Sequence, residues 1–223
     1  MKKSVLVAFG GLALLGASVG ANAASYFFDG FESTTPAITA NGGQWQVFNE
    51  LTKWKTVGGP GIEVQNGVVD GIAAYDGERK IELDSHPAPG NSAMETKNGI
   101  DLLAGSYTLS FWYLGRTATA ETNGINYKIF NVDDVDGDNV IGFGTAEDVL
   151  AKNWQKIKLD FNLTAATKIG IYFAAVGTDD TYGGLVDNVR LVGTPVPVPA
   201  AAWLFGSALM GLVGVARRRS SKV

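Results

Sequence analysis

The sequence contains no cysteine and only one histidine. Without cysteine there are no disulfides, so a folded domain must be stabilised by its hydrophobic core, with or without a metal ion. The sole histidine, His86, precedes a proline and is expected in a solvated loop, and a zinc site built from several histidines is excluded. A Gly-rich phosphate-binding loop is also missing, and no serine or pair of carboxylates stands out as catalytic. We therefore expect no enzymatic activity.

Positive charge is scarce between the two ends of the chain. Residues 1–23 and 195–223 hold six of the 18 basic residues and no acidic residue, so residues 24–194 contain 12 basic and 22 acidic residues, a net charge of −10. Nucleic-acid binding requires a positively charged surface and is excluded on this basis. The composition fits a solvated surface domain, or one that recruits divalent cations.

The N-terminus has the three parts of a secretory signal. Lys2 and Lys3 are followed by an apolar stretch over residues 5–19 and by Ala21-Asn22-Ala23, the small-x-small pattern that signal peptidase cleaves. We expect residues 1–23 to be removed and the protein to be exported across the inner membrane.

The C-terminus predicts a short membrane anchor. Residues 200–216 are uncharged and mostly apolar, and at about 1.5 Å per residue they span roughly 25 Å, the lower limit for crossing a bilayer core. Arg217, Arg218 and Arg219 follow at once and would remain cytoplasmic. The membrane is therefore an expected partner of this helix.

The order of features over residues 195–223 resembles the PEP-CTERM sorting signal of Gram-negative-type bacteria. The Pro-rich motif over residues 195–199, with Val196, Pro197, Val198 and Pro199, precedes the apolar helix and the basic tail of residues 217–223. The resemblance implies processing by exosortase, a membrane-embedded enzyme, after which the protein lies at the cell surface or outside the cell. Val198 stands where the family usually has Glu, and this is the one departure from the family's pattern. Prolines also keep such a segment extended, which suits a protease cleft or a plain stalk.

Turn signals and alternating strands fill residues 24–194. Asn-Gly occurs at positions 41, 66, 98 and 123 and Asp-Gly at 29, 70, 76 and 136, and both dipeptides favour tight turns. Tyr107, Leu109, Phe111 and Tyr113 share one face of a predicted strand, and residues 157–161, 169–173 and 185–191 alternate in the same way. The pattern predicts an all-β domain, an antiparallel β-sandwich of the jelly-roll type.

The same region resembles the galactose-binding-like jelly rolls, which include carbohydrate-binding modules. The resemblance rests on residues 29–32, 61–64, 105–111 and 182–189. It implies a structural Ca²⁺ between the opening and closing strands, with Glu32 and Asp187 as carboxylate ligands; alternatively, these are a surface residue and a turn former. A second candidate is the loop with Asp134, Asp136 and Asp138, which mimics half of an EF-hand but lacks its Gly and final Glu; the alternative is an acidic hairpin tip. No other cofactor is expected.

Aromatic side chains are the candidate ligand-binding residues. Sugars stack their apolar faces on flat rings, and Trp54, Trp45 and Tyr75 lie in the loop-rich first third, with Arg116 and Tyr127 on neighbouring strands. Trp54 is the first choice because two lysines flank it. The alternative is that these aromatic residues fill the core.

Together these features predict a non-catalytic, exported protein that binds polysaccharide in the exopolysaccharide or biofilm layer. The alternative is a structural or adhesive matrix protein that acts through protein partners, and a third reading is a carbohydrate-active enzyme. Exposed rings in a concave face would favour the first, and buried rings with a flat apolar patch the second.

Overall fold

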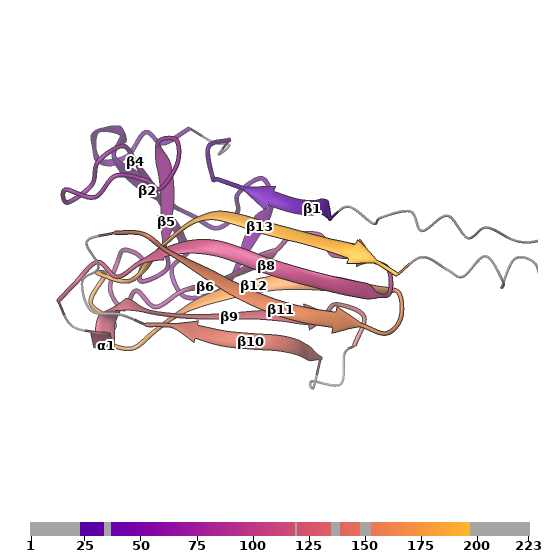
Figure 1. Cartoon of the computed structure of the whole chain (residues 1–223). Helices are drawn as coiled ribbons and strands as arrows, with labels where there is room; N and C mark the ends of the chain where they lie inside the picture. Colours follow the sequence, from indigo (N-terminus) through magenta and orange to yellow (C-terminus); the bar gives the residue numbers. More distant parts are fainter. Residues whose placement is uncertain (1–22, 34–36, 119, 135–138, 148–152, 197–223) are drawn as a thin grey trace, which may run out of the picture.

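The computed structural model describes residues 23–33, 37–118, 120–134, 139–147 and 153–196. These residues form two antiparallel sheets that pack face to face (Figure 1). The predicted all-β sandwich is therefore confirmed. Among the described residues, no helix is long and apolar enough to cross a membrane, and the predicted segment 200–216 lies outside them, as do residues 1–22.

The larger sheet has seven strands, in the order β11-β8-β13-β5-β4-β2, with β1 also paired to β13. These strands are β1 (Ala24–Asp29), β2 (Trp45–Phe48), β4 (Ile62–Asn66), β5 (Arg79–Glu82), β8 (Gly105–Leu114), β11 (Gln155–Leu163) and β13 (Leu185–Pro195).

The smaller sheet has six strands, in the order β10-β9-β12-β6-β3, with β7 paired to β12. Its strands are β3 (Trp54–Gly58), β6 (Ala93–Thr96), β7 (Ile100–Leu102), β9 (Gly124–Asn131), β10 (Val140–Ala146) and β12 (Thr167–Val176). Two short helices, η1 (Asn41–Gly43) and α1 (Ala120–Asn123), lie in connections.

The core lies between the sheets and follows the predicted alternation. Tyr107, Leu109, Phe111 and Tyr113 of β8 are all buried, and so are the inward residues of β12. Because neighbouring residues of a strand point to opposite faces, Ser110 and Trp112 lie on the outer face of the larger sheet.

Strand β13 has two partners in succession along one edge. Leu185 and Val186 pair with β5, and residues from Val189 onward pair with β1. Between these segments the register shifts, and Asn188 has a positive φ of 51°. At Asp187, beside this bulge and between the segments that pair with β5 and with β1, β13 contacts the loop before β5, whose backbone N–H groups at Tyr75 and Asp76 bind this carboxylate.

Candidate functional site

A groove of about 530 Å³ lies over the outer face of the larger sheet, beside the bulge of β13. Its lining combines aromatic rings with charged and polar groups, from β1, β8, β11, β13 and the loop before β5: Phe28, Tyr75, Asp76, Ser110, Trp112, Lys156, Asn188 and Arg190. A mixture of flat apolar surfaces and hydrogen-bonding groups in a concave site is typical of small-ligand and sugar recognition.

Tyr75 forms one wall of the groove. Its ring lies parallel to that of Trp112, with centroids 3.7 Å apart, and Trp154 meets it edge-on at 6.4 Å. The indole N–H of Trp154 donates to the carbonyl of Ala73 at 3.3 Å. The Tyr75 side chain is held by these rings and is still 40% exposed, while Phe28 across the groove is 43% exposed. Both rings therefore offer a surface on which a ligand can stack.

Asp187 holds the loop that carries Tyr75. This carboxylate is fully buried and accepts the backbone N–H groups of Tyr75 at 2.9 Å, Asp76 at 3.2 Å and Asn188 at 2.6 Å. Burial raises the pKa of Asp187 to about 7, and the three N–H groups oppose the rise. The carboxylate thus fixes the groove wall from beneath.

Glu32 binds the same loop further along. Its Oε1 accepts the backbone N–H groups of Glu78 at 3.0 Å and Arg79 at 2.9 Å. The structure therefore brings the two predicted metal ligands, Glu32 and Asp187, to one loop, where Oε1 of Glu32 and Oδ2 of Asp187 accept backbone N–H groups. No cluster of three or more Asp, Glu or His side chains that suits a metal occurs in the described part of the chain. The calcium site stays a prediction. In the second candidate, Asp134 is described, whereas Asp136 and Asp138 lie outside the described residues.

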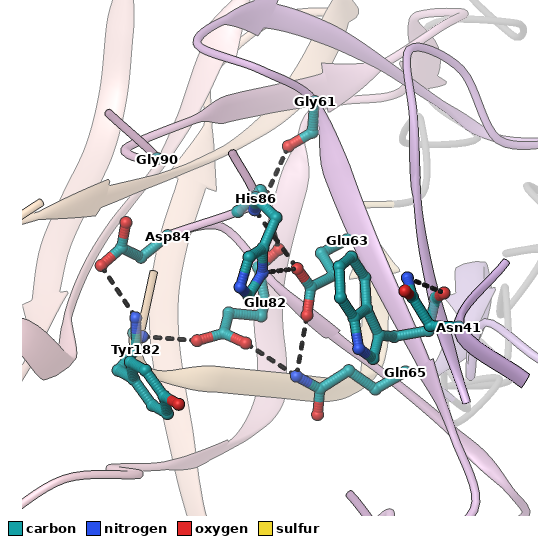
Figure 2. A network of polar contacts seen from close by, with 12 residues as sticks. Asn41, Gly61, Glu63, Gln65, Glu82, Asp84, His86, Gly90 and Tyr182 are labelled. Carbon is teal, nitrogen blue, oxygen red and sulfur yellow. Dashed lines mark hydrogen bonds and ion pairs between the residues drawn. The ribbon is translucent and has the colours of Figure 1, made fainter. Parts of the chain in front are cut away.

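A buried polar network underlies the far end of the larger sheet (Figure 2). The amide of Gln65 donates to Glu63 at 3.0 Å and to Glu82 at 2.7 Å, and the His86 ring contacts Glu63 at 2.9 Å through Nδ1. All these groups except His86 are buried. The sole histidine therefore joins this buried network from a partly exposed position.

Arg116 belongs to this network through its ion pair with Glu82. Its guanidinium pairs with Glu82 and Asp70 and lies 4.6 Å from the centre of the Tyr182 ring. Burial raises the pKa of Glu82 well above its usual range, and the positive charge of Arg116 opposes this. Only 6% of the Arg116 side chain is exposed, and its contact with a ligand stays a prediction.

Trp54, the first choice for ligand binding, lies in the core, which is the alternative named for the aromatic residues. Its side chain is completely buried between the sheets, and its indole N–H donates to Asp29 at 2.8 Å. Tyr127 is 8% exposed and packs edge-to-face on Phe111 at 5.0 Å. Both rings point inward because each occupies an inward position of its strand, and neither presents a face to solvent.

The other two predicted aromatic residues are partly or largely accessible. Trp45, on β2, stacks on His86 with centroids 4.5 Å apart and is half-buried. Tyr75 lies in the groove described above. The remaining lining residues were not predicted as ligand-binding, because they meet only when β1 pairs with β13 and β8 pairs with β11.

No family model and no curated protein matches the chain. Among solved structures, the Stig cyclase Fisc from Fischerella sp. TAU is 17% identical and matches 79% of this chain and 100% of its own, with a TM-score of 0.54. TmCBM61, solved with β-1,4-galactotriose, is 20% identical over 64% of this chain and 90% of its own, with a TM-score of 0.46. The K3 adhesin domain of Lys-gingipain from Porphyromonas gingivalis is 17% identical over 77% of this chain and 99% of its own, with a TM-score of 0.43. Similarity at this level concerns the jelly-roll fold alone.

Proposed function

We propose that the protein is a non-catalytic polysaccharide-binding protein and that the ligand lies in the groove between Tyr75 and Phe28. The observation that carries this proposal is the pair of half-exposed rings on either side of a polar floor formed by Ser110, Asn188 and Arg190. A sugar ring can stack its apolar face on the aromatic side chains while its hydroxyls bind the polar groups.

A binding role fits the chemistry of the carboxylates near the groove. Asp187 is buried and saturated with backbone N–H groups, and Asp76 lies 3.4 Å from the side-chain amide of Asn188. These contacts fix the shape of the groove, so we assign the two carboxylates a structural role. In a glycosidase, two carboxylates would face the scissile bond.

Export and sorting complete the proposal. The signal peptide, the Pro-rich motif and the basic tail support export by signal peptidase, a transient membrane anchor and processing by exosortase, which would place the groove in the exopolysaccharide layer. β1 begins at Ala24, the residue expected to follow the cleavage site, and pairs there with Gly193.

A second candidate function is adhesion through a protein partner. On the outer face of the smaller sheet, Phe143 is 76% exposed and Val140 is 43% exposed, beside Tyr172 in a groove of about 500 Å³. Exposed apolar residues of this kind are typical of protein-binding surfaces.

Binding of the full-length chain to a panel of bacterial and plant polysaccharides tests both candidates. We expect saturable binding to one class of glycan, loss of that binding in Tyr75→Ala, and retention in Phe143→Ala, which removes a ring from the opposite sheet. Binding that is lost in Phe143→Ala and kept in Tyr75→Ala would reject the proposed groove. Absence of glycan binding by a folded protein would favour a protein partner.

A further inference from the structure

Basic side chains cross the outer face of the larger sheet at the groove. The strand registers place Arg190 of β13 beside Phe28 of β1 on one side and Ser110 of β8 on the other, and Ser110 lies opposite Lys158 of β11. Lys156, two residues before Lys158, lies opposite Trp112. Alternation puts all of these side chains on one face, so the row continues directly from the aromatic walls.

These cations are exposed and free of ion pairs with described residues. Arg190, Lys156 and Lys158 are all exposed, and none of the ion pairs between described residues involves them. Arg190 instead lies 5.3 Å from the centre of the Phe28 ring, and Lys156 lies 6.0 Å from that of Trp112. A ring below a cation orients it and leaves its N–H donors available.

The position of this basic row contrasts with the charge of the domain. Residues 24–194 carry a net charge of −10, yet the groove holds two cations against the single carboxylate of Asp76 at its surface. A ligand that only stacked on rings would gain nothing from this concentration of positive charge. A negatively charged ligand would be attracted to the groove and repelled by most of the remaining surface.

We propose that the groove binds an acidic polysaccharide, with the sugar rings on Tyr75 and Phe28 and their carboxylates on Arg190 and the β11 lysines. The inference rests on the proposed function and specifies its ligand as a polyuronate. The planar guanidinium of Arg190 can donate two parallel hydrogen bonds to a carboxylate, and the lysines supply point charges along the chain. Neighbouring strands lie about 4.8 Å apart, so Arg190 and Lys158, two strands apart, can contact carboxylates about 10 Å apart.

The test compares three polymers with the full-length chain: alginate, its propylene glycol ester with the carboxylates blocked, and dextran sulfate as a polyanion without carboxylates. We expect alginate to bind, the ester to bind at least about tenfold more weakly, and dextran sulfate to bind weakly. Added salt should weaken alginate binding because the charges are exposed.

Matched variants locate the contact. Arg190→Gln should weaken alginate binding by about tenfold. Lys128→Gln removes one positive charge from the opposite sheet, where Lys128 lies 4.5 Å from the centre of the Tyr172 ring, and it should leave binding unchanged. Equal melting temperatures of the variants and the native protein confirm that folding is intact.

The outcomes separate this inference from the proposed function. Equal binding of alginate and its ester, still lost in Tyr75→Ala, would keep the polysaccharide groove and reject the acidic ligand. Equal weakening by Arg190→Gln and Lys128→Gln, or equal binding of dextran sulfate, would reduce the effect to non-specific charge attraction and overturn the inference. Absence of binding to neutral and acidic polysaccharides alike would reject both proposals.

Discussion

At the scale of single residues, Trp54 and Tyr75 are each held by a carboxylate from a strand elsewhere in the chain. Asp29 of β1 accepts the indole N–H of Trp54 at 2.8 Å, and Asp187 of β13 accepts the backbone N–H of Tyr75 at 2.9 Å. Lys53 and Lys55 flank Trp54, and this charge suggested an exposed ring. In a strand, however, the neighbours of an inward residue point outward, so flanking lysines indicate burial. Tyr75 lies in a loop without such a pattern, and its position depends on Asp187, 112 residues further along the chain.

Trp54→Phe tests the structural role of the buried indole. The substitution keeps a ring in the core. It removes the indole N–H, which in the native protein donates to the Asp29 carboxylate at 2.8 Å. We expect the free energy of unfolding to fall by about 2 kcal/mol, measured by urea denaturation, with glycan binding of the folded protein unchanged. Trp45→Phe, at a half-buried edge position, is the control and should cost less than about 1 kcal/mol. A larger loss of stability in Trp45→Phe than in Trp54→Phe would contradict the structural role of the Trp54 indole.

The burial of Lys80 leads us to predict that the stability of the protein rises with pH in the alkaline range. Its side chain is fully buried and donates to the carbonyl of Gly67 at 3.1 Å. Burial and the positive charge of Arg116 lower the pKa of Lys80 to about 8, against the raising effect of the carboxylates of Asp187, Glu82 and Asp70. The pKa of the unfolded lysine is about 10.4, so between these values the unfolded chain holds a proton that the folded chain has lost. The free energy of unfolding should therefore rise with pH in this interval.

Urea denaturation between pH 8 and about 9.5, below the range in which tyrosines ionise, measures this rise. Lys80→Met removes the titrating group and should flatten the profile. A native profile that is already flat, or an unchanged slope in the variant, would show that Lys80 titrates normally.

At the scale of elements, strand β13 decides where the groove forms. Its alternating residues predicted a strand over 185–191, and the structure extends it from Leu185 to Pro195. The sequence did not reveal the bulge at Asn188, because a bulge depends on the change of partner from β5 to β1 and not on local alternation. Without this shift in register, Arg190 would lie on the face opposite to that of Asp187 and Trp112.

Substitution of Asn188 tests this dependence. Its φ of 51° lies in the left-handed region, which glycine and asparagine tolerate and β-branched residues do not. Asn188→Gly should leave the melting temperature close to that of the native protein. Asn188→Val should destabilise the protein by about 1–2 kcal/mol and weaken glycan binding as the bulge rearranges. Equal stability of the two variants would argue against a required bulge.

At the scale of the whole molecule, the two ends of the described domain lie together and away from the groove. β1 begins and β13 ends at the same end of the sandwich, side by side (Figure 1). The groove lies on the outer face of the larger sheet, along the length of these strands. A tether that continues from Pro195 would therefore leave the groove open to a polysaccharide at the side of the domain.

The predicted sorting motif begins where the described fold ends, and this makes its proposed processing testable. The N–H of Val196 donates to the carbonyl of Ala104 at 2.8 Å, so Val196 still belongs to the folded domain. Val198 comes two residues later in the sequence. Because the resemblance implies recognition of Glu between two prolines, Val198→Glu should increase the processed fraction several-fold in a bacterium with exosortase, measured by the mass of the released protein. Val196→Glu creates the same tripeptide against the domain, where the fold obstructs a protease, and it should increase processing less. An equal increase of the processed fraction in both variants would show that the fold does not limit processing. An increase in a strain without exosortase would indicate another protease.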